Sequence, residues 1–283
     1  DAFTGKLCPE CGNGGEVALA EHGRYKPDQV ASSSPPAIAN GVIVVGSSII
    51  DFALAEAPRG VVAAFDAASG SPLWQFDPLA GIAHTGGANV WAPIAIDAER
   101  DLVFLPTSAP SPDYYGVLRP GNNQNANSVV ALRLSTGEQV WSFQLSHHDL
   151  WDFDTPAQPT LFDWPGEHGP IPALAQVTKQ GFVFVLDRRN GEPLLPIEER
   201  PVATSSIPGE VTSPTQPFPI KPPPLMPTSL AADEAWGLTF WDRQQCRDKI
   251  AALNNQGLFT PPSEQPTLMF PGSLGGANWG GGA

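Results

Sequence analysis

One phrase recurs along the chain and constrains its fold more than any other feature. An apolar run, usually closed by Asp, leads into a turn that ends in Gly, and a Trp or a large apolar residue follows. Copies lie at 62–74, 130–141 and 184–195, and a copy without its front half lies at 1–8. The third copy has Leu195 in place of Trp. The turn glycines are separated by 65, 67 and 54 residues and are Gly5, Gly70, Gly137 and Gly191.

Each copy has the pattern of a β-hairpin. The apolar run is typical of a strand, and the Gly supplies the positive φ that a tight turn needs. The Trp is then expected to pack on the neighbouring unit. Repeats of this length built from strands indicate an all-β fold, a β-propeller of four-stranded blades with insertions between strands. Four unrelated hairpins would not share this order of residues.

Other segments complete the predicted organisation. The Pro-rich stretch 200–228 is predicted to be a long ordered excursion without a set of strands, and 242–255 a short helix. Closed propellers have about four to eight blades, and about four are represented here. Because the chain opens inside a copy of the phrase, we expect residues 1–283 to form a single partial domain, an internal segment whose flanking blades are missing. Further strands are predicted at 41–46, 90–96, 102–105 and 176–186.

Composition excludes several classes of function. The formal net charge is −14 and basic residues do not cluster. Nucleic acid and anionic membrane surfaces are therefore not expected as partners, because both require basic surface. Nowhere do about 18 apolar residues run together as a membrane span requires. Eight Trp and 14 Phe argue against disorder.

The three cysteines leave alternatives open. Cys8 and Cys11 form a Cys-x-x-Cys pair, and Cys246 lies far along the chain. Such a pair is typical of half a zinc site, a redox pair or a disulfide. Zinc would need two more ligands, so we favour a disulfide, either Cys8–Cys11 or Cys8–Cys246.

The segment 147–154 carries the densest set of reactive side chains. Five of its eight residues are His or Asp, and it directly follows the predicted strand 140–144. Three interpretations fit this composition. The segment could supply a carboxylate base with imidazole neighbours, ligate a metal, or form a polar turn whose Asp side chains cap backbone amides.

A resemblance to a known protein family bears on the choice among these three interpretations of residues 147–154. The run His-His-Asp-Leu-Trp-Asp-Phe-Asp-Thr-Pro-Ala-Gln-Pro-Thr-Leu at 147–161 resembles the signature of pyrroloquinoline quinone (PQQ)-dependent dehydrogenases, closest to the membrane-bound glucose dehydrogenase type. The repeat also resembles the tryptophan-docking motif of that family's eight-bladed propeller. The resemblance covers nearly the whole chain, in matching order, at 33–36, 60–66, 89–93, 178–181, 259–262 and 270–280.

The resemblance implies roles for four residues. Asp149 aligns with the catalytic base that takes the hydroxyl proton while hydride passes to PQQ. Trp91 aligns with the tryptophan stacked on PQQ, Lys179 with the lysine that donates to the quinone oxygens, and Asn278 with an asparagine near the C5 carbonyl. We expect the side chains of Asp152 and Asp154 to orient neighbouring groups or to cap backbone amides. Without the resemblance, Trp91 would be read as a core residue, Lys179 as a solvated strand end and Asn278 as a turn residue.

The resemblance also implies a divalent cation, Ca²⁺ or Mg²⁺, bound by oxygen ligands. Asp51 falls on the family's aspartate ligand and Ser111 on its hydroxyl ligand. The residue after Asp51 is usually Asn in the glucose type, but here it is Phe52, whose side chain cannot ligate.

The implied function is oxidation of a sugar, polyol or other alcohol, with ubiquinone or another acceptor taking the electrons. Glucose-type, glycerol or polyol, and quinate-type enzymes share these motifs. The implied location is the periplasm, with an inner-membrane anchor in a missing N-terminal region as one form of the protein. The fragment alone is expected to be inactive. The alternative is a non-catalytic propeller scaffold of the assembly-factor kind, although retention of Asp149, Trp91, Lys179 and Asn278 together favours the enzyme.

Overall fold

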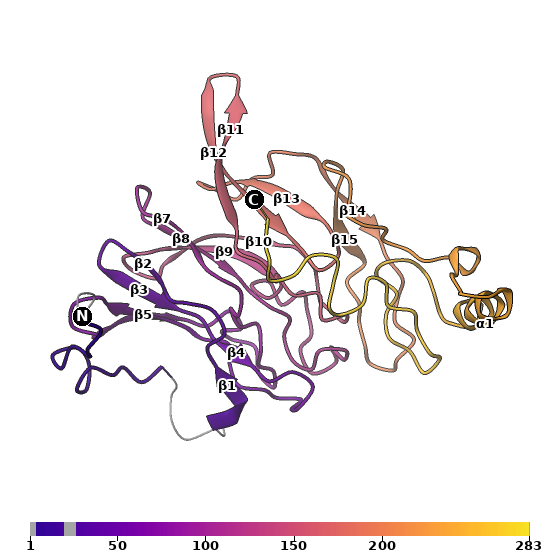
Figure 1. The fold of residues 1–283 in the computed structure, drawn as a ribbon, viewed down its shortest axis with the longest axis horizontal. Helices are drawn as coiled ribbons and strands as arrows, with labels where there is room; N and C mark the ends of the chain where they lie inside the picture. Colours follow the sequence, from indigo (N-terminus) through magenta and orange to yellow (C-terminus); the bar gives the residue numbers. More distant parts are fainter. Residues whose placement is uncertain (1–3, 20–26, 283) are drawn as a thin grey trace.

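The computed structural model describes residues 4–19 and 27–282, and its regular secondary structure is almost entirely antiparallel sheet (Figure 1). Two of these sheets have four strands. The first has the order β2 (Ala37–Ala39), β3 (Val42–Val45), β5 (Val62–Asp66), β6 (Pro72–Phe76). The second has the order β10 (Gln139–Gln144), β9 (Ser128–Arg133), β8 (Leu102–Pro106), β7 (Ala95–Asp97).

The remaining elements are smaller. A three-stranded sheet has the order β11 (Thr160–Gly166), β12 (Gly169–Val177), β13 (Val183–Asp187). Two-stranded ribbons pair β1 (Val30–Ala31) with β4 (Ser48–Ile49), and β14 (Ile197–Pro201) with β15 (Thr215–Pro219). The helices are η1 (Pro27–Gln29), η2 (Ala232–Glu234) and α1 (Phe240–Ala251).

The recurring phrase forms the predicted hairpins. Copies one and two build β5–β6 and β9–β10, and their turn glycines Gly70 and Gly137 have φ of 72° and 74°. In the third copy Gly191 has φ of 76°, but the residues after it make only an isolated bridge to β13. Gly5 has φ of 67°, whereas residues 1–3 of that copy lie outside the described residues.

Each Trp of the phrase docks on the Gly turn of the next sheet, as predicted. Trp74 donates from Nε1 to the Leu134 carbonyl at 2.8 Å, and its ring lies so close to Gly137 that an added Cβ would be 2.7 Å away. Trp141 repeats this arrangement one sheet further on. Its Nε1 donates to Arg188 at 2.9 Å, and a Cβ at Gly191 would lie 2.7 Å from the ring.

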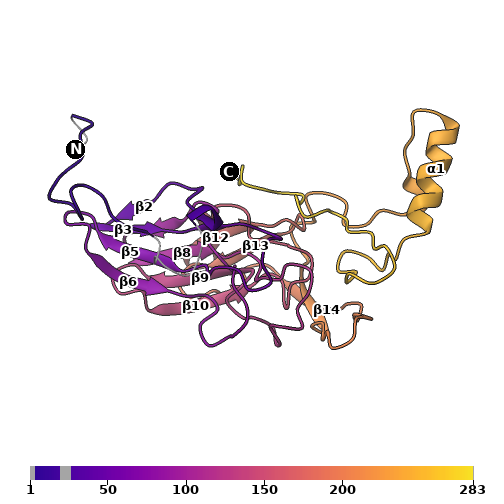
Figure 2. The same ribbon diagram turned by 90° about the horizontal axis from the view of Figure 1, so that it is seen from below.

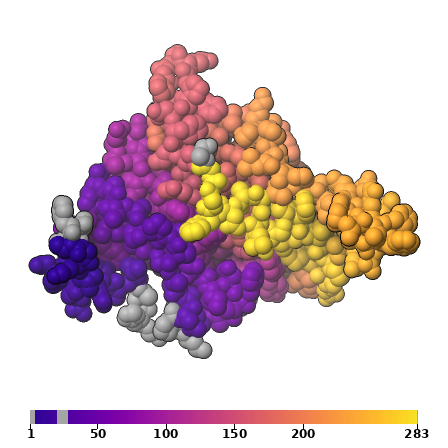
Figure 3. Space-filling view, viewed as in Figure 1, coloured from indigo at the N-terminus to yellow at the C-terminus, as the bar shows by residue number. Residues whose placement is uncertain are grey.

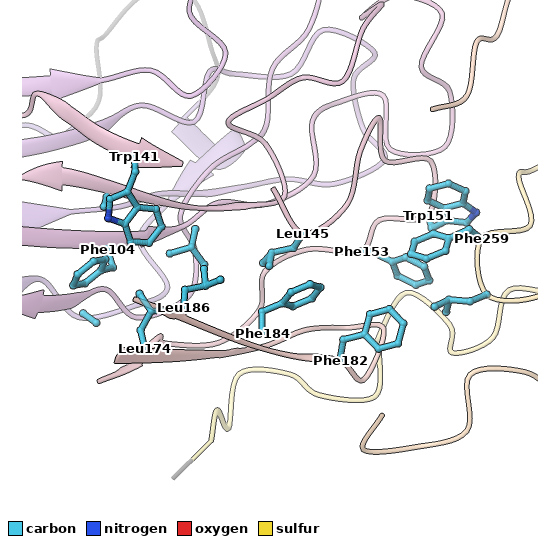
Figure 4. Packing of buried hydrophobic residues seen from close by; sticks show 14 of the residues in the cluster. Phe104, Trp141, Leu145, Trp151, Phe153, Leu174, Phe182, Phe184, Leu186 and Phe259 are labelled. Atoms are coloured by element: carbon cyan, nitrogen blue, oxygen red, sulfur yellow. The ribbon is translucent and has the colours of Figure 1, made fainter. Parts of the chain in front are cut away.

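The core fills the spaces between neighbouring sheets. One cluster joins the first two sheets around Trp74, and a larger one joins the second and third around Trp141. Figure 4 shows the larger cluster running from Phe104 and Trp141, past Phe184, to Trp151, Phe153 and Phe259. The hydrophobic core therefore extends from the strands to the segment that follows β10.

The described part holds an incomplete portion of about four blades, as predicted, of which two are complete four-stranded sheets. The structure changes three other expectations. The Pro-rich stretch 200–228 is not free of strands, because β15 lies within it and pairs with β14. The helix forms, but at 240–251, where Thr239 caps it and accepts from the Asp242 amide. All three cysteines are free thiols, so neither predicted disulfide is present.

The helix and the last segment lie outside the stacked sheets. No residue of α1 is buried, and the helix stands away from the sheets at the end opposite the N-terminal segment (Figure 2). Figure 3 shows the C-terminal segment, in yellow, lying across the middle of one face. No helix within 4–19 or 27–282 is long and apolar enough to cross a bilayer.

Gly137→Ala tests the docking contact. The added Cβ would strain a left-handed residue, at about 1 kcal/mol, and displace the Trp74 ring, at about 1–3 kcal/mol more. Gly41→Ala is the matched control, because Gly41 has φ of 76° with nothing within 4 Å of the added Cβ. We expect urea unfolding to show a clearly larger loss for Gly137→Ala; equal losses would contradict the docking role.

Candidate active site

The turn of residues 146–154, here called the acidic turn, connects β10 to β11 and is placed by its apolar members. Leu150, Trp151 and Phe153 are each 1% exposed and belong to the core. The Trp151 ring meets the Phe259 ring edge-on at 5.0 Å, and its Nε1 donates to the Thr260 carbonyl at 2.7 Å. Because these side chains are fixed in the core, the acidic residues between them are held in fixed positions as well.

Asp149 points into the protein and holds the acidic turn together. Its carboxylate accepts from the amides of Trp151 and Phe153 at 3.2–3.3 Å and from the Ser146 hydroxyl at 3.2 Å. The residue is 1% exposed. Burial raises the pKa of Asp149 to about 6, and the nearby Arg119 guanidinium limits the rise. These contacts are those of a capping residue.

Asp152 and Asp154 face a buried lysine. Lys179, in the turn between β12 and β13, donates from Nζ to the Asp152 carbonyl at 2.8 Å, the Asp152 carboxylate at 3.2 Å and the Asp154 carboxylate at 2.8 Å. All three side chains are less than 10% exposed. Asp154 is fixed further by the Ala109 amide at 2.7 Å and by Trp91 Nε1 at 3.2 Å. Trp91 and Lys179, both predicted to bind cofactor, therefore meet at Asp154.

The electrostatics of this group are asymmetric. Burial, followed by the like charge of Asp154, raises the pKa of Asp152 to about 9, and Lys179 only partly opposes this. Burial acts to lower the pKa of Lys179, but Asp154 and Asp152 outweigh it and hold the pKa above its usual value. Near neutral pH the site therefore keeps a lysine cation, while the carboxyl group of Asp152 retains its proton.

The contacts of the aspartates differ from those expected, and the catalytic role of Asp149 stays a prediction. Sequence reasoning gave Asp149 the chemistry and gave Asp152 and Asp154 the capping. In the structure Asp149 caps, while Asp152 lies against Lys179. One signal in the sequence could have shown the capping contacts of Asp149. In a capping turn an Asp side chain usually accepts a hydrogen bond from the backbone amide two residues later, and Trp151 lies two residues after Asp149.

Asn278 lies in the C-terminal segment, which packs on the backbone of Lys179. Gly276 donates to the Lys179 carbonyl at 2.7 Å, and a Cβ at Gly275 would lie 2.7 Å from the lysine side chain. The Asn278 amide itself is exposed and donates to the Leu274 carbonyl at 2.7 Å. The segment thus reaches the lysine, and the role predicted for the Asn278 side chain stays a prediction.

The two predicted metal ligands differ in fit. Surrounding protein, then Asp154 and Asp113, raise the pKa of Asp51 to about 6, although its side chain is open to solvent, so this carboxylate fits a cation ligand. The Ser111 hydroxyl accepts from the amides of Ala57 and Gly86 at 3.2 and 3.0 Å and donates to Ala55 at 3.2 Å. Its lone pairs are used, so Ser111 does not fit a metal ligand.

The surroundings of Asp51 supply no ready metal cluster. Phe52, which replaces the expected Asn, stacks on Tyr114 at 5.3 Å, and its amide donates to Asp113 at 3.2 Å. Within the described ranges, no three His, Cys, Asp or Glu side chains are arranged to hold a metal. The donor set present therefore fits a cation in part.

Comparison of the chain with known proteins identifies a family and several relatives. The family model described as "Glucose/ethanol/alcohol dehydrogenase, beta-propeller domain", for PQQ, matches residues 1–283. The chain is 42% identical to the glycerol dehydrogenase large subunit of Gluconobacter oxydans and 40% identical to the quinoprotein glucose dehydrogenase of Escherichia coli, covering 99% of this chain in both cases. It spans only 40% and 37% of those two proteins. The crystal structure of quinohemoprotein alcohol dehydrogenase from Comamonas testosteroni matches with a TM-score of 0.53 and 25% identity, over 68% of this chain and 32% of that one.

The raised pKa of Asp152 predicts a pH dependence of stability. An acid whose folded-state pKa lies above its unfolded value favours unfolding as pH rises from about 4 to about 9, by at most about 1.4 kcal/mol per pH unit. Asp152→Asn should remove this loss, so its stability relative to wild type should increase between pH 5 and pH 9 in urea unfolding.

Asp66→Asn is the control for that titration. Hydrogen bonds from Ser69 hold the pKa of Asp66 below its usual value, so it stays ionised throughout this pH window. Its stability difference from wild type should be flat. A flat difference for Asp152→Asn as well would contradict the raised pKa.

Proposed function

The chain belongs to the PQQ-dependent dehydrogenase family, as part of its β-propeller domain, and from this membership we propose that it contributes the catalytic carboxylate and the cofactor lysine of a quinoprotein that oxidises a sugar, polyol or other alcohol. A quinone such as ubiquinone as electron acceptor, and a periplasmic location, belong to the same proposal. The named substrates of the relatives, glycerol and glucose, support the substrate class.

One observation carries the proposal. Lys179, in the turn between β12 and β13, is buried between Asp152 and Asp154. Trp91 donates to Asp154 as well. Buried ion pairs are poor sources of stability, because desolvation costs about as much as the attraction returns. A buried group of this kind is better explained by chemistry than by folding.

These residues suit the needs of PQQ. When bound, this cofactor supplies an ortho-quinone that accepts hydride. Lys179 would donate to a quinone oxygen in place of one of its carboxylate acceptors, and the half-buried Trp91 ring would give a planar cofactor a face on which to lie. Asp51 would supply one oxygen ligand to Ca²⁺ or Mg²⁺. Asn278, carried on the segment that packs on Lys179, would line the same end of the site.

We assign the proton-accepting role to Asp152 rather than Asp149. The carboxylate of Asp149 is committed to two amides and a hydroxyl, whereas within residues 4–19 and 27–282 that of Asp152 has Lys179 as its single side-chain partner. A Ca²⁺ or Mg²⁺ ion bound close to Asp152 would lower the pKa of its carboxyl group, so that the group would be ionised near neutral pH. The carboxylate could then take the substrate hydroxyl proton.

Paired substitutions in the full-length protein, loaded with PQQ and Ca²⁺, test this assignment. Asp152→Asn should lower kcat by about 10²–10⁴-fold in dye-linked oxidation of sugars and polyols while PQQ still binds. Asp149→Asn should lower the unfolding midpoint, because a capping carboxylate is lost. Full turnover in Asp152→Asn, with turnover lost in a stable Asp149→Asn protein, would return the role to Asp149.

Titration with PQQ separates the enzyme from a non-catalytic scaffold. Lys179→Met should weaken PQQ binding by about 10–100-fold, as expected for the loss of a charge-assisted hydrogen bond. Lys249→Met, at the exposed end of α1, is the matched control and should bind as wild type does. If the wild-type full-length protein shows no quinone absorbance after incubation with PQQ, the scaffold is favoured.

A further inference from the structure

The Pro-rich stretch 200–228, here called the excursion, sends two side chains to the acidic turn. Gln216 lies on β15, and Glu210 lies in the loop between β14 and β15. Gln216 is 0% exposed, and the Glu210 side chain is 2% exposed. Neither belongs to the group around Lys179, and the function proposed above uses neither. Buried polar side chains that reach across 60 or more residues of sequence require a structural reason.

The side chain of Gln216 pairs with the backbone of His147 in the way that a neighbouring strand would. The His147 amide donates to its Oε1 at 2.8 Å, and its Nε2 donates to the His147 carbonyl at 2.6 Å. This reciprocal pair is what a neighbouring strand would offer. The excursion thus holds the first part of the acidic turn just after β10 has ended.

Glu210 fixes the next residue through its side chain. His148 Nε2 lies 2.8 Å from Glu210 Oε1, and Nδ1 lies 2.7 Å from the Gly121 carbonyl. A carbonyl only accepts, so Nδ1 carries a proton, and a second proton lies between Nε2 and the carboxyl oxygen. Both ring nitrogens are used and the imidazole cannot turn.

The loop of residues 112–123 is trapped between the excursion and the acidic turn. The Gly116 amide donates to Glu210 Oε2, and a Cβ at Gly116 would lie 2.2 Å from His148 Nε2. Arg119, 0% exposed, donates to the carbonyls of Asp149 and Pro112. The excursion, the loop and the acidic turn therefore form one buried hydrogen-bonded unit.

The acidic turn needs such support because its backbone is strained. His148 and Asp152 have φ of 44° and 56°, left-handed values that cost a residue other than Gly about 1–2 kcal/mol. Asp149 caps the turn between them. Without outside contacts, a right-handed backbone at His148 would be favoured and Asp152 would be carried away from Lys179.

We propose that Glu210 and Gln216 are positioning residues, which hold the acidic turn in its left-handed conformation and so set the geometry between Asp152 and Lys179. The effect on turnover rests on the proposed function, whereas the effect on the conformation of the turn does not. Through these two buried side chains the excursion supports the site.

Glu210→Ala tests this proposal in the full-length protein. In the apoprotein, hydrogen exchange of the Trp151 and Phe153 amides should be at least about 10-fold faster than in wild type, because the turn opens locally. With PQQ and Ca²⁺, kcat should fall about 10–100-fold while KM changes less than about two-fold, as expected for a misplaced catalytic group. Glu210→Gln should restore most of both values, because its amide can donate to His148 Nε2 and its oxygen can accept from Gly116, while the acceptor of the Val211 amide is lost.

Glu199→Ala is the matched control. Glu199 also pairs with a histidine of the acidic turn, at 3.1 Å from His147 Nε2, but its side chain is 50% exposed. It should leave both exchange and kcat unchanged. Gln216→Ala should repeat the effects of Glu210→Ala and serves as the test if Glu210→Ala does not fold.

Unchanged amide exchange in both Glu210→Ala and Gln216→Ala would overturn the proposal. So would a Glu199→Ala protein as impaired as Glu210→Ala. A wild-type protein that is inactive on every sugar and alcohol would count against the proposed function alone, because the exchange measurement needs no turnover.

Discussion

The contact between a tryptophan and the glycine turn of the next sheet is the constraint on which the rest of the structure depends. The indole is fixed twice, by its ring against a Cα without a side chain and by its N–H on a backbone carbonyl. Gly137 and Gly191 meet two demands at once, a left-handed backbone and space for a ring. Such a contact fixes both the distance and the register between neighbouring sheets. The third copy of the phrase has Leu195 in place of Trp, and its sheet has no fourth strand.

Register between the second and third sheets is what brings the site together. Trp141 docks β10 onto the third sheet, and β10 ends three residues later, just before the acidic turn, while Lys179 lies in the turn between β12 and β13. Burial of Trp151 and Phe153 then orients the turn (Figure 4). The ionic group is therefore placed by apolar contacts, and its own attractions need supply little stability.

Much of this could be predicted from the sequence, because hairpins and their glycine turns are local. The three copies in the described part gave the correct turns, and the resemblance correctly identified the family. The capping contacts of Asp149 could not be predicted in this way, since they depend on the left-handed residues at His148 and Asp152. The hydrogen bonds of Ser111 could not be predicted for a similar reason, because the backbone groups that use its hydroxyl come from distant segments. His148 and Glu210 lie 62 residues apart, with the strands β11 to β14 between them, and no spacing pattern reports such a contact. The prolines within β15 argued against a strand there, although a two-stranded ribbon tolerates residues that have no backbone N–H to donate.

The acidic turn lies between two buried cations, and this explains how a strained segment can be a fixed one. On one side Arg119 donates to the carbonyl of Asp149, and on the other Lys179 donates to the carbonyl of Asp152. A turn with left-handed residues exposes carbonyls that no strand can pair, and burying them unpaired would cost more than the strain itself. Charged donors form the strongest hydrogen bonds available for this purpose. Lys179 is thus held by the backbone that it helps to fix, so that the group available to a cofactor is already in place before any cofactor arrives.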